Sequence, residues 1–167
     1  ASSAASDVYK RQVKYGSEVI KYREKFIKHL GEVCQKIHNK LTGGKEKILL
    51  EYDRDVGYDS YLTELAKKRQ KDLKYSTTTV GPHRDDISFI VNGIDIRKYG
   101  SQGQQRTAAL SLKLAQIQLM REVMKESPIL LLDDVLSELD SNRKTYLLES
   151  IKDTQTITVS YTHLTLP

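Results

Sequence analysis

The sequence predicts an α/β fold, a mixed sheet with flanking helices joined to part of a helical arm, and three observations lead to this prediction. Residues 13–41 carry apolar side chains at three- and four-residue spacing, which indicates a long amphipathic helix. Residues 87–99 alternate apolar and polar side chains about Asn92-Gly93, the pair favoured in type I′ hairpin turns. Residues 129–132 form a continuous apolar run, typical of a strand covered on both faces of a parallel or mixed sheet.

The amino-terminal half contains two predicted helices with a strand between them. Thr42-Gly43-Gly44 ends the first helix, and residues 47–53 (KILLEYD) form a strand. A polar loop then places Asp59 or Ser60 to cap a second helix over residues 61–74. The β-branched residues 75–80 (YSTTTV) predict a further short strand, which GPHRDD (81–86) ends.

The second helix is strongly basic. Such a helix usually presents a solvated face, and the alternative is a set of salt-sensitive contacts with DNA phosphates. The residues concerned are Lys67, Lys68, Arg69, Lys71 and Lys74. Because the ten tyrosines are scattered rather than interleaved with basic residues, the sequence favours contact with a duplex or junction backbone over stacking on single-stranded bases.

Composition limits the class of protein. A chain of 167 residues with 38% hydrophobic content is large enough for one domain or one and a half. It has no apolar run near the roughly 18 to 20 residues of a membrane span and no apolar secretory core at its start, so we expect a cytoplasmic protein with no membrane partner. A net charge of +5 and a pI near 9.1 permit contact with phosphate backbones.

Cysteine and histidine do not predict a metal site. The single cysteine, Cys34, excludes an intramolecular disulfide, and the four scattered histidines give no zinc-ligand spacing. We expect Cys34 to be a buried or idle thiol. His29 and His38, nine residues apart in the first helix, are expected at the surface or at its edge.

A loop rich in glycine and glutamine precedes the helix predicted at about residues 104–125. A helix amino terminus presents free N–H groups and the positive end of the helix dipole, which suits a phosphate oxygen. Ser101 can donate a hydrogen bond, Gly103 allows close approach of the backbone, and a run of donors follows: Gln104, Gln105 and Arg106. The alternative is that Gly100 and Gly103 only shape the turn and Ser101 only caps the helix.

The apolar strand at 129–132 ends in Asp133-Asp134. In open α/β sheets, ligands bind at the carboxyl ends of the strands. An apolar strand that delivers an acid to a nucleotide-bound Mg²⁺ is a Walker B element, although one of these acids can instead cap the helix that follows. The order of the two features, a glycine-rich loop and then an acid-tipped strand, favours the phosphate interpretation.

Three motifs in this order and spacing closely resemble the carboxyl-terminal half of the RecF family: GPHRDD at 81–86, GSQGQQRTAALSLKLAQI at 100–117 and ILLLDDVLSELD at 129–140. The resemblance covers about residues 13–159. It implies the carboxyl-terminal lobe of an ABC-type ATPase head, related to the heads of SMC and Rad50 proteins, with part of a helical arm. It also implies a role in DNA replication, recombinational repair and the repair of replication gaps, in which ATP drives head dimerisation on DNA and hydrolysis resets the complex.

The resemblance implies cofactors, partners and residue roles as well. The cofactors are ATP and Mg²⁺, and the partners are gapped or junction DNA, a second copy of the protein, and the RecO and RecR mediators. The signature loop, which in the family contacts the γ-phosphate of a nucleotide held by a second protomer, corresponds to Ser101, Gln102, Gly103, Gln104, Gln105 and Arg106. Asp133 corresponds to the Walker B acid on Mg²⁺, and Asp134 to the acid that orients or activates the attacking water.

Two further motifs carry implied roles. The D-loop at the dimer seam corresponds to Ser137, Glu138, Leu139 and Asp140. His83 and Arg84 are candidates for contact with nucleotide or with the partner head, and the alternative is a hydrogen-bonded turn between strands.

The sequence also departs from the family pattern. A P-loop requires G-x-x-x-x-G-K-[ST], and the pair Gly44-Lys45 has Asn39 in place of the first glycine and Glu46 after the lysine. We therefore predict that these 167 residues neither bind ATP tightly nor hydrolyse it alone, so that ATPase activity belongs to the full-length protein. Asp134 is one methylene shorter than the glutamate of many ABC proteins, which suits slow turnover.

The ends of the chain do not fit the family pattern either. We interpret residues 1–12 and 160–167 as foreign tails, residues 13–75 as the helical arm with the basic helix and a short strand, and residues 76–159 as the ATPase lobe. Rival functions are a non-catalytic nucleic-acid-binding arm or adaptor, another SMC- or Rad50-like head, which needs long heptad repeats, and a transporter cassette, which needs an apolar surface for membrane partners.

Overall fold

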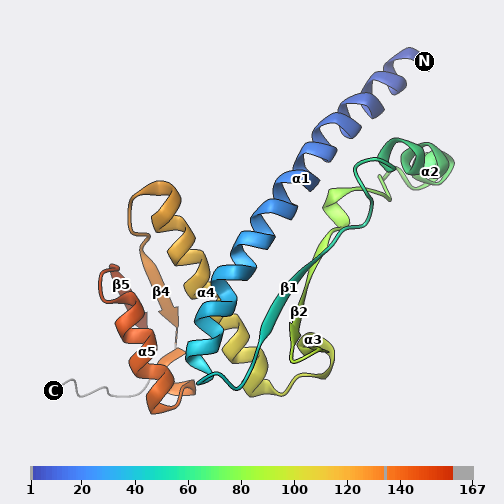
Figure 1. Cartoon of the computed structure of the whole chain (residues 1–167). Helices are drawn as coiled ribbons and strands as arrows, with labels where there is room; N and C mark the ends of the chain where they lie inside the picture. The colour runs from blue at the N-terminus through green and yellow to red at the C-terminus, as the bar shows by residue number, and fades with distance from the viewer. Residues whose placement is uncertain (1, 134, 160–167) are drawn as a thin grey trace. The chain divides into compact units, whose positions relative to one another are not determined.

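The structure is a computed structural model that describes residues 2–133 and 135–159 (Figure 1). It divides the chain into two compact units that are interleaved along the sequence. The first unit contains residues 1–31 and 49–90, and the second contains residues 32–48 and 91–167. The domain boundary expected at residues 75 and 76 stays a prediction.

The first unit is built from the amino-terminal part of helix α1 and the elements that follow it. These elements are α1 (Ser2–Leu41), β1 (Ile48–Asp53), α2 (Tyr61–Tyr75), the 3-10 helix η1 (Pro82–Arg84) and β2 (Asp86–Val91). Its core joins α1, α2 and the loops around them, and consists of Ile20, Val56, Tyr61, Leu65 and Val80, with Tyr9, Val13 and Tyr52 packed against it. The strand predicted at 47–53 and the helix predicted at 61–74 are confirmed within one residue. Ser60 occupies the N-cap position of α2, but its side chain makes no capping hydrogen bond.

The first helix is longer than expected at its start. The sequence predicted a helix over residues 13–41, whereas α1 begins at Ser2 and ends, as predicted, at Leu41. Residues 7–12 contain neither proline nor glycine, and Tyr9 packs against the core of the first unit, so nothing interrupts the helix there. At the other end, Gly43 and Gly44 adopt positive φ angles of 59° and 78°.

The strand predicted over residues 75–80 is wrong. Ser76 adopts a left-handed conformation with φ of 50° at the end of α2, and residues 77–80 form no strand. The Asp72 side chain explains this conformation, because its Oδ1 accepts hydrogen bonds from the Thr79 backbone N–H (3.1 Å) and from the Thr79 hydroxyl (2.6 Å). A buried carboxylate thus holds the segment as a loop, overriding the β-propensity of its threonines.

Gly81 makes a backbone turn that a larger residue does not fit. It has φ of 138° and ψ of −178°, a region that side-chain-bearing residues avoid. A Cβ atom there would lie 2.5 Å from the Tyr61 hydroxyl oxygen. We expect Gly81→Ala to lower the free energy of unfolding by at least about 2 kcal/mol in urea denaturation, from strain together with the clash.

The matched control for this prediction is Gly43→Ala. Gly43 also has a positive φ, of 59°, but a Cβ there would meet no atom within 4 Å. Its substitution therefore measures backbone strain without a clash. Equal losses of stability for the two variants would show that the contact with Tyr61 has no energetic consequence.

The second unit contains the predicted signature loop and the strand that ends in Asp133. Its elements are β3 (Ile94–Asp95), α3 (Ile96–Tyr99), α4 (Gln102–Met124), β4 (Leu130–Asp133), the 3-10 helix η2 (Val135–Glu138), α5 (Ser141–Ile151) and β5 (Thr156–Val159). The strands of the chain form a sheet of order β1-β2-β3 and a separate parallel pair, β4-β5. The helix predicted at about 104–125 is confirmed as α4, which begins two residues earlier.

The predicted hairpin turn is confirmed, but its second strand is shorter than expected. Asn92 and Gly93 both have positive φ, 50° and 83°, as a type I′ turn requires. The Asn92 side chain also accepts a hydrogen bond from the Lys47 backbone N–H at 2.9 Å. After Asp95 the chain forms α3 instead of continuing as a strand, because the Asp95 carboxylate accepts from the Arg97 N–H (3.0 Å) and caps a helical turn.

Strand β4 exists as predicted, but it is not covered on both faces. It pairs in parallel with β5, and Leu131 lies opposite Ile157. These two side chains are 71% and 52% exposed, whereas Leu132 is buried. The continuous apolar run correctly indicated a strand, and the described part of the chain covers only one of its faces.

The described residues include no helix both long and apolar enough to span a membrane.

Candidate functional site

The amino terminus of α4 is closed by a capping box. Ser101 Oγ accepts a hydrogen bond from the Gln104 backbone N–H at 3.2 Å, and the Gln104 side-chain oxygen accepts from the Ser101 N–H at 3.1 Å. The structure therefore bears out the capping role of Ser101. Since the hydroxyl oxygen only accepts in this arrangement, its hydrogen remains able to donate, and Ser101 itself is exposed. The capping and phosphate interpretations are thus compatible.

The two glycines of the loop have different roles. A Cβ atom on Gly100 would lie 2.6 Å from both the Cβ and the carbonyl oxygen of Ile96, so Gly100 is required by the tight turn after α3. A Cβ atom on Gly103 would meet only Ser101 Oγ, at 3.9 Å, and otherwise opens onto free space. Gly103 is therefore the position at which a ligand can approach the helix backbone.

Asp133 ends β4 with an exposed side chain. In Figure 1, strand β4 runs in the opposite direction to helix α4. The neighbouring acid, Asp134, lies outside the described residues. Its role in orienting the attacking water stays a prediction.

The predicted D-loop runs through η2 into α5. Leu139 is buried, and Asp140 caps α5 by accepting a hydrogen bond from the Arg143 backbone N–H at 3.0 Å. This bond, together with the Arg143 guanidinium 3.3 Å away, lowers the pKa of Asp140. The predicted contacts of Ser137 and Glu138 concern side chains outside the described part of the structure.

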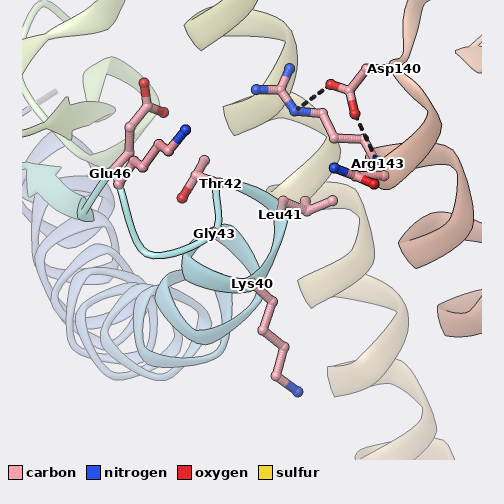
Figure 2. Close-up of a pocket in the computed structure, with 9 residues that line it drawn as sticks. Lys40, Leu41, Thr42, Gly43, Glu46, Asp140 and Arg143 are labelled. Carbon is pink, nitrogen blue, oxygen red and sulfur yellow. Dashed lines mark hydrogen bonds and ion pairs between the residues drawn. The ribbon is translucent and has the colours of Figure 1, made fainter.

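A hollow of about 420 Å³ lies between the loop that ends α1 and the start of α5 (Figure 2). The loop contributes Thr42, Gly43 and Glu46, and α5 contributes its cap Asp140 and Arg143. Glu46 also bonds to α4, because its Oε1 accepts from Gln104 Nε2 at 3.2 Å. The loop at residues 40–46 therefore bonds to the start of α4 through Glu46, and it lines one hollow together with Asp140, the last residue of the predicted D-loop.

His38 is not at the surface or at its edge, as the sequence had suggested. It is completely buried, with Nδ1 2.9 Å from Ser111 Oγ and Nε2 3.2 Å from Glu46 Oε2. Burial lowers its pKa, against the opposing effect of Glu46. The sequence did contain a signal for this position. His38 lies four residues after Cys34, on the apolar stripe of α1, which indicates an inward side chain.

Sequence reasoning also missed Glu46, which was noted only because it breaks the P-loop pattern. Its partner, Gln104, lies 58 residues later in the sequence. No pattern of neighbouring residues around Glu46 predicts that contact. The expectation for Cys34 is confirmed: its thiol is buried, and burial raises its pKa to about 12.

The GPHRDD segment takes part in a hydrogen-bond network in the first unit. Asp85 accepts hydrogen bonds from the Tyr52 hydroxyl, from Arg23 Nη1 (3.1 Å) and from the Asp55 N–H (3.0 Å). Burial and the bond to Asp85 raise the pKa of Tyr52 to about 12. These contacts favour the structural interpretation of the motif.

The two candidate residues of that motif have partners within the same unit. His83 Nε2 lies 2.9 Å from the Thr78 carbonyl oxygen, and Arg84 Nε lies 3.6 Å from Asp55 Oδ1. Both side chains are nevertheless exposed. Contact with nucleotide or with a partner head stays a prediction for them.

The basic residues of α2 are all exposed, as a solvated face or a DNA contact requires. Lys67 forms an ion pair with Glu64 one helical turn away, with 2.7 Å between Nζ and Oε1. Arg69 lies over the Tyr9 ring, 5.8 Å from its centroid. The geometry is compatible with both interpretations of this helix.

The described residues contain no group of three or more acidic, histidine or cysteine side chains arranged to hold a metal ion. A single exposed carboxylate such as Asp133 nevertheless fits Mg²⁺ in a nucleotide site, because that ion keeps several waters and takes one or two carboxylates together with phosphate oxygens.

Helix α4 has a capped, glycine-containing start, strand β4 ends in an acid, and α5 is capped by Asp140. This is the order of features expected for the carboxyl-terminal lobe of an ABC-type ATPase head. A solved structure described as the recombination mediator protein RecF with ATP, in the RecFOR pathway, matches 95% of this chain and 45% of its own with a TM-score of 0.82 and 37% identity. A second, described as RecF with ATPrS, matches 90% of this chain and 43% of its own with a TM-score of 0.75 and 38% identity. The chain belongs to the RecF family.

Curated relatives show the same similarity. The DNA replication and repair protein RecF of Agathobacter rectalis is 56% identical over 145 residues, which is 87% of this chain and 40% of that protein. RecF of Lachnospira eligens is 55% identical over 152 residues, or 90% of this chain and 42% of that protein. This chain therefore spans less than half the length of these relatives. No family model matches it.

Proposed function

We propose that this chain supplies the signature loop, the Walker B acid and the D-loop of an ATP-dependent DNA-binding protein of replication and recombinational repair. The observation that carries the proposal is the capping box of α4, which leaves the Ser101 hydroxyl hydrogen and the Gly103 surface exposed in a chain 56% identical to a RecF protein. A protein with this role works on chromosomal DNA in the bacterial cytoplasm.

In the proposed mechanism, each part of the site has one task. Bound ATP with Mg²⁺ would supply the phosphoanhydride that is cleaved. Ser101 donates its hydroxyl hydrogen to an oxygen of the terminal phosphate in the partner's nucleotide, and Gly103 lets the helix terminus approach closely. Asp133 holds the position of a metal ligand, and Asp134 that of the residue that orients the attacking water.

This division of the site explains why ATP would cause dimerisation. The donors at Ser101 and Gly103 and the acid at Asp133 belong to one chain, and the nucleotide that Ser101 contacts is held by another. Because these donors pair with the charged phosphate only when two heads close, binding energy from the nucleotide appears as association. Hydrolysis removes the shared phosphate and reopens the dimer.

The proposed partners are gapped or junction DNA, a second copy of the protein, and the RecO and RecR mediators. Similarity to a solved recombination mediator protein of the RecFOR pathway supports the last of these. The exposed basic face of α2 supports contact with DNA phosphates. Such contacts would make DNA affinity fall steeply with salt concentration.

The proposal is tested with a hybrid protein, called the RecF hybrid below. In it, the segment of Agathobacter rectalis RecF that matches this chain over 145 residues is replaced by the matching residues of this chain. We expect ATP to convert the hybrid from monomer to dimer on gapped DNA in analytical ultracentrifugation, and ADP not to do so. The isolated 167-residue chain should show no ATP binding by calorimetry.

Two results would contradict the proposal. A hybrid that stays monomeric with ATP and DNA would remove the ATP-driven dimer and favour a non-catalytic adaptor. Micromolar binding of ATP by the isolated chain would show that its nucleotide site is complete without a Walker A loop.

A further inference from the structure

The Gln104 side chain has two separate partners, and this arrangement fixes its orientation. Its amide oxygen accepts from the Ser101 N–H at 3.1 Å, and its amide nitrogen donates to Glu46 Oε1 at 3.2 Å. An ionised carboxylate only accepts hydrogen bonds, so Glu46 bonds to the nitrogen end of the amide and not to the oxygen end. The oxygen end is thereby left facing the Ser101 N–H. Glu46 thus selects the amide orientation that closes the capping box.

Glu46 is in turn held in place from its other side. Its Oε2 lies 3.2 Å from Nε2 of His38, which is fully buried in the last turns of α1. A neutral His38 that donates from Nε2 has Nδ1 available as an acceptor. Ser111 Oγ lies 2.9 Å from Nδ1 and 2.7 Å from the Thr107 carbonyl oxygen, so its single hydroxyl hydrogen has two acceptors within reach. Ser111 is itself completely buried.

The chain of hydrogen bonds begins and ends on the same helix. It leaves α4 at Gln104, passes through Glu46 and His38, and returns to α4 at Ser111, seven residues further on. Residues seven apart lie on one face of a helix, so these two contacts fasten two turns of α4, one to the last turns of α1 through His38 and the other to the loop after α1 through Glu46. The first of those turns is the one that presents Ser101.

We propose that Glu46 is a positioning residue for the signature loop: by holding the Gln104 amide, it fixes the Ser101 backbone and the direction of the Ser101 hydroxyl. This inference rests on the proposed function, because it concerns the contact of that hydroxyl with a phosphate of the partner's nucleotide. Glu46 does not itself touch nucleotide, and nucleotide binding within one head does not involve it.

The decisive variants replace the Glu46 carboxylate by an amide, alone or together with replacement of the Gln104 amide by a carboxylate. Glu46→Gln keeps the size of the side chain but can present either a donor or an acceptor to Gln104, so the amide orientation is no longer selected. The double variant Glu46→Gln with Gln104→Glu restores it, because the amide introduced at position 46 would donate to the carboxylate introduced at position 104, which also accepts from the Ser101 N–H. The oxygen of that introduced amide would face His38 Nε2. Glu126→Gln, at an exposed position after α4, is the matched control for loss of one charge.

In the RecF hybrid we expect Glu46→Gln to weaken ATP-driven dimerisation and to lower kcat about 5- to 20-fold, the effect of one lost charge-assisted hydrogen bond, with ATP affinity of the monomer unchanged. The double variant should recover dimerisation to within about threefold of the unaltered hybrid, and Glu126→Gln should not change it. Wild-type dimerisation by Glu46→Gln would overturn the proposal. So would a double variant that is no better than the single one.

A second measurement separates this inference from the proposed function. Hydrogen exchange of the Ser101 amide, followed without ATP, reports on the capping box alone. We expect Glu46→Gln to accelerate this exchange about 5- to 20-fold and the double variant to restore slow exchange. Unchanged exchange in Glu46→Gln would overturn the positioning role even if dimerisation of this variant is weakened. Accelerated exchange in a hybrid that never dimerises would support the positioning role and count against the proposed function.

Discussion

Ser101→Arg in the RecF hybrid is expected to abolish ATP-driven dimerisation while the monomer stays folded. The substitution removes the hydroxyl donor and places a long side chain beside the open surface at Gly103, where the partner's nucleotide would approach. Loss of a hydrogen bond to a charged group together with a steric block weakens association by at least about 100-fold. The measurement is sedimentation of the hybrid with ATP across a range of protein concentrations.

Two controls accompany this variant. Loss of the helix cap costs only about 1 kcal/mol, so thermal unfolding of the monomer should shift by a few degrees at most. Ser101→Thr keeps both the capping oxygen and the hydroxyl hydrogen and should dimerise with ATP. Normal dimerisation of Ser101→Arg would remove this loop from the interface.

Asp133→Asn is expected to leave ATP binding within about threefold and to lower kcat for hydrolysis by at least about 100-fold. The amide keeps the shape of the side chain but removes the charge that a metal ligand at the end of β4 provides. The measurement is single-turnover hydrolysis by the RecF hybrid, with ATP affinity determined separately. Because the ATP-bound dimer is no longer reset, it should accumulate on DNA.

The matched control is Asp153→Asn, an exposed acid beyond the end of α5, which should hydrolyse ATP as the unaltered hybrid does. An Asp133→Asn hybrid with normal kcat would show that the acid at the end of β4 is not a metal ligand. Loss of ATP binding in parallel with kcat would instead indicate that Asp133 is needed to hold the nucleotide.

Local patterns predicted the elements of this chain well. The spacing of apolar side chains identified α1, a capping position preceded the predicted α2, and Asn92-Gly93 identified the hairpin turn, because each of these signals arises within a few neighbouring residues. Where prediction failed, a side chain changed the outcome. Asp72 draws Thr79 into a loop, and Asp95 caps α3 where a strand was expected.

The candidate site was predictable to a different extent. Ser101, Gly103 and Asp133 were visible because helix starts and strand ends leave characteristic residues in the sequence. Glu46 and His38 were not, because their partners lie 58 and 73 residues away, at Gln104 and Ser111. The exposure of one face of β4 could not be predicted either. An apolar run indicates a buried strand, but it does not indicate which residues cover each face.

The sequence by itself determined which segments become helices and strands, where the capped start of α4 falls, and which family the motifs resemble, because these depend on side chains close together along the chain. The tertiary structure decided that a carboxylate from the loop after α1 selects the orientation of the Gln104 amide. A hydrogen bond exists only when two groups are within about 3 Å, and for residues far apart in sequence only folding determines that distance.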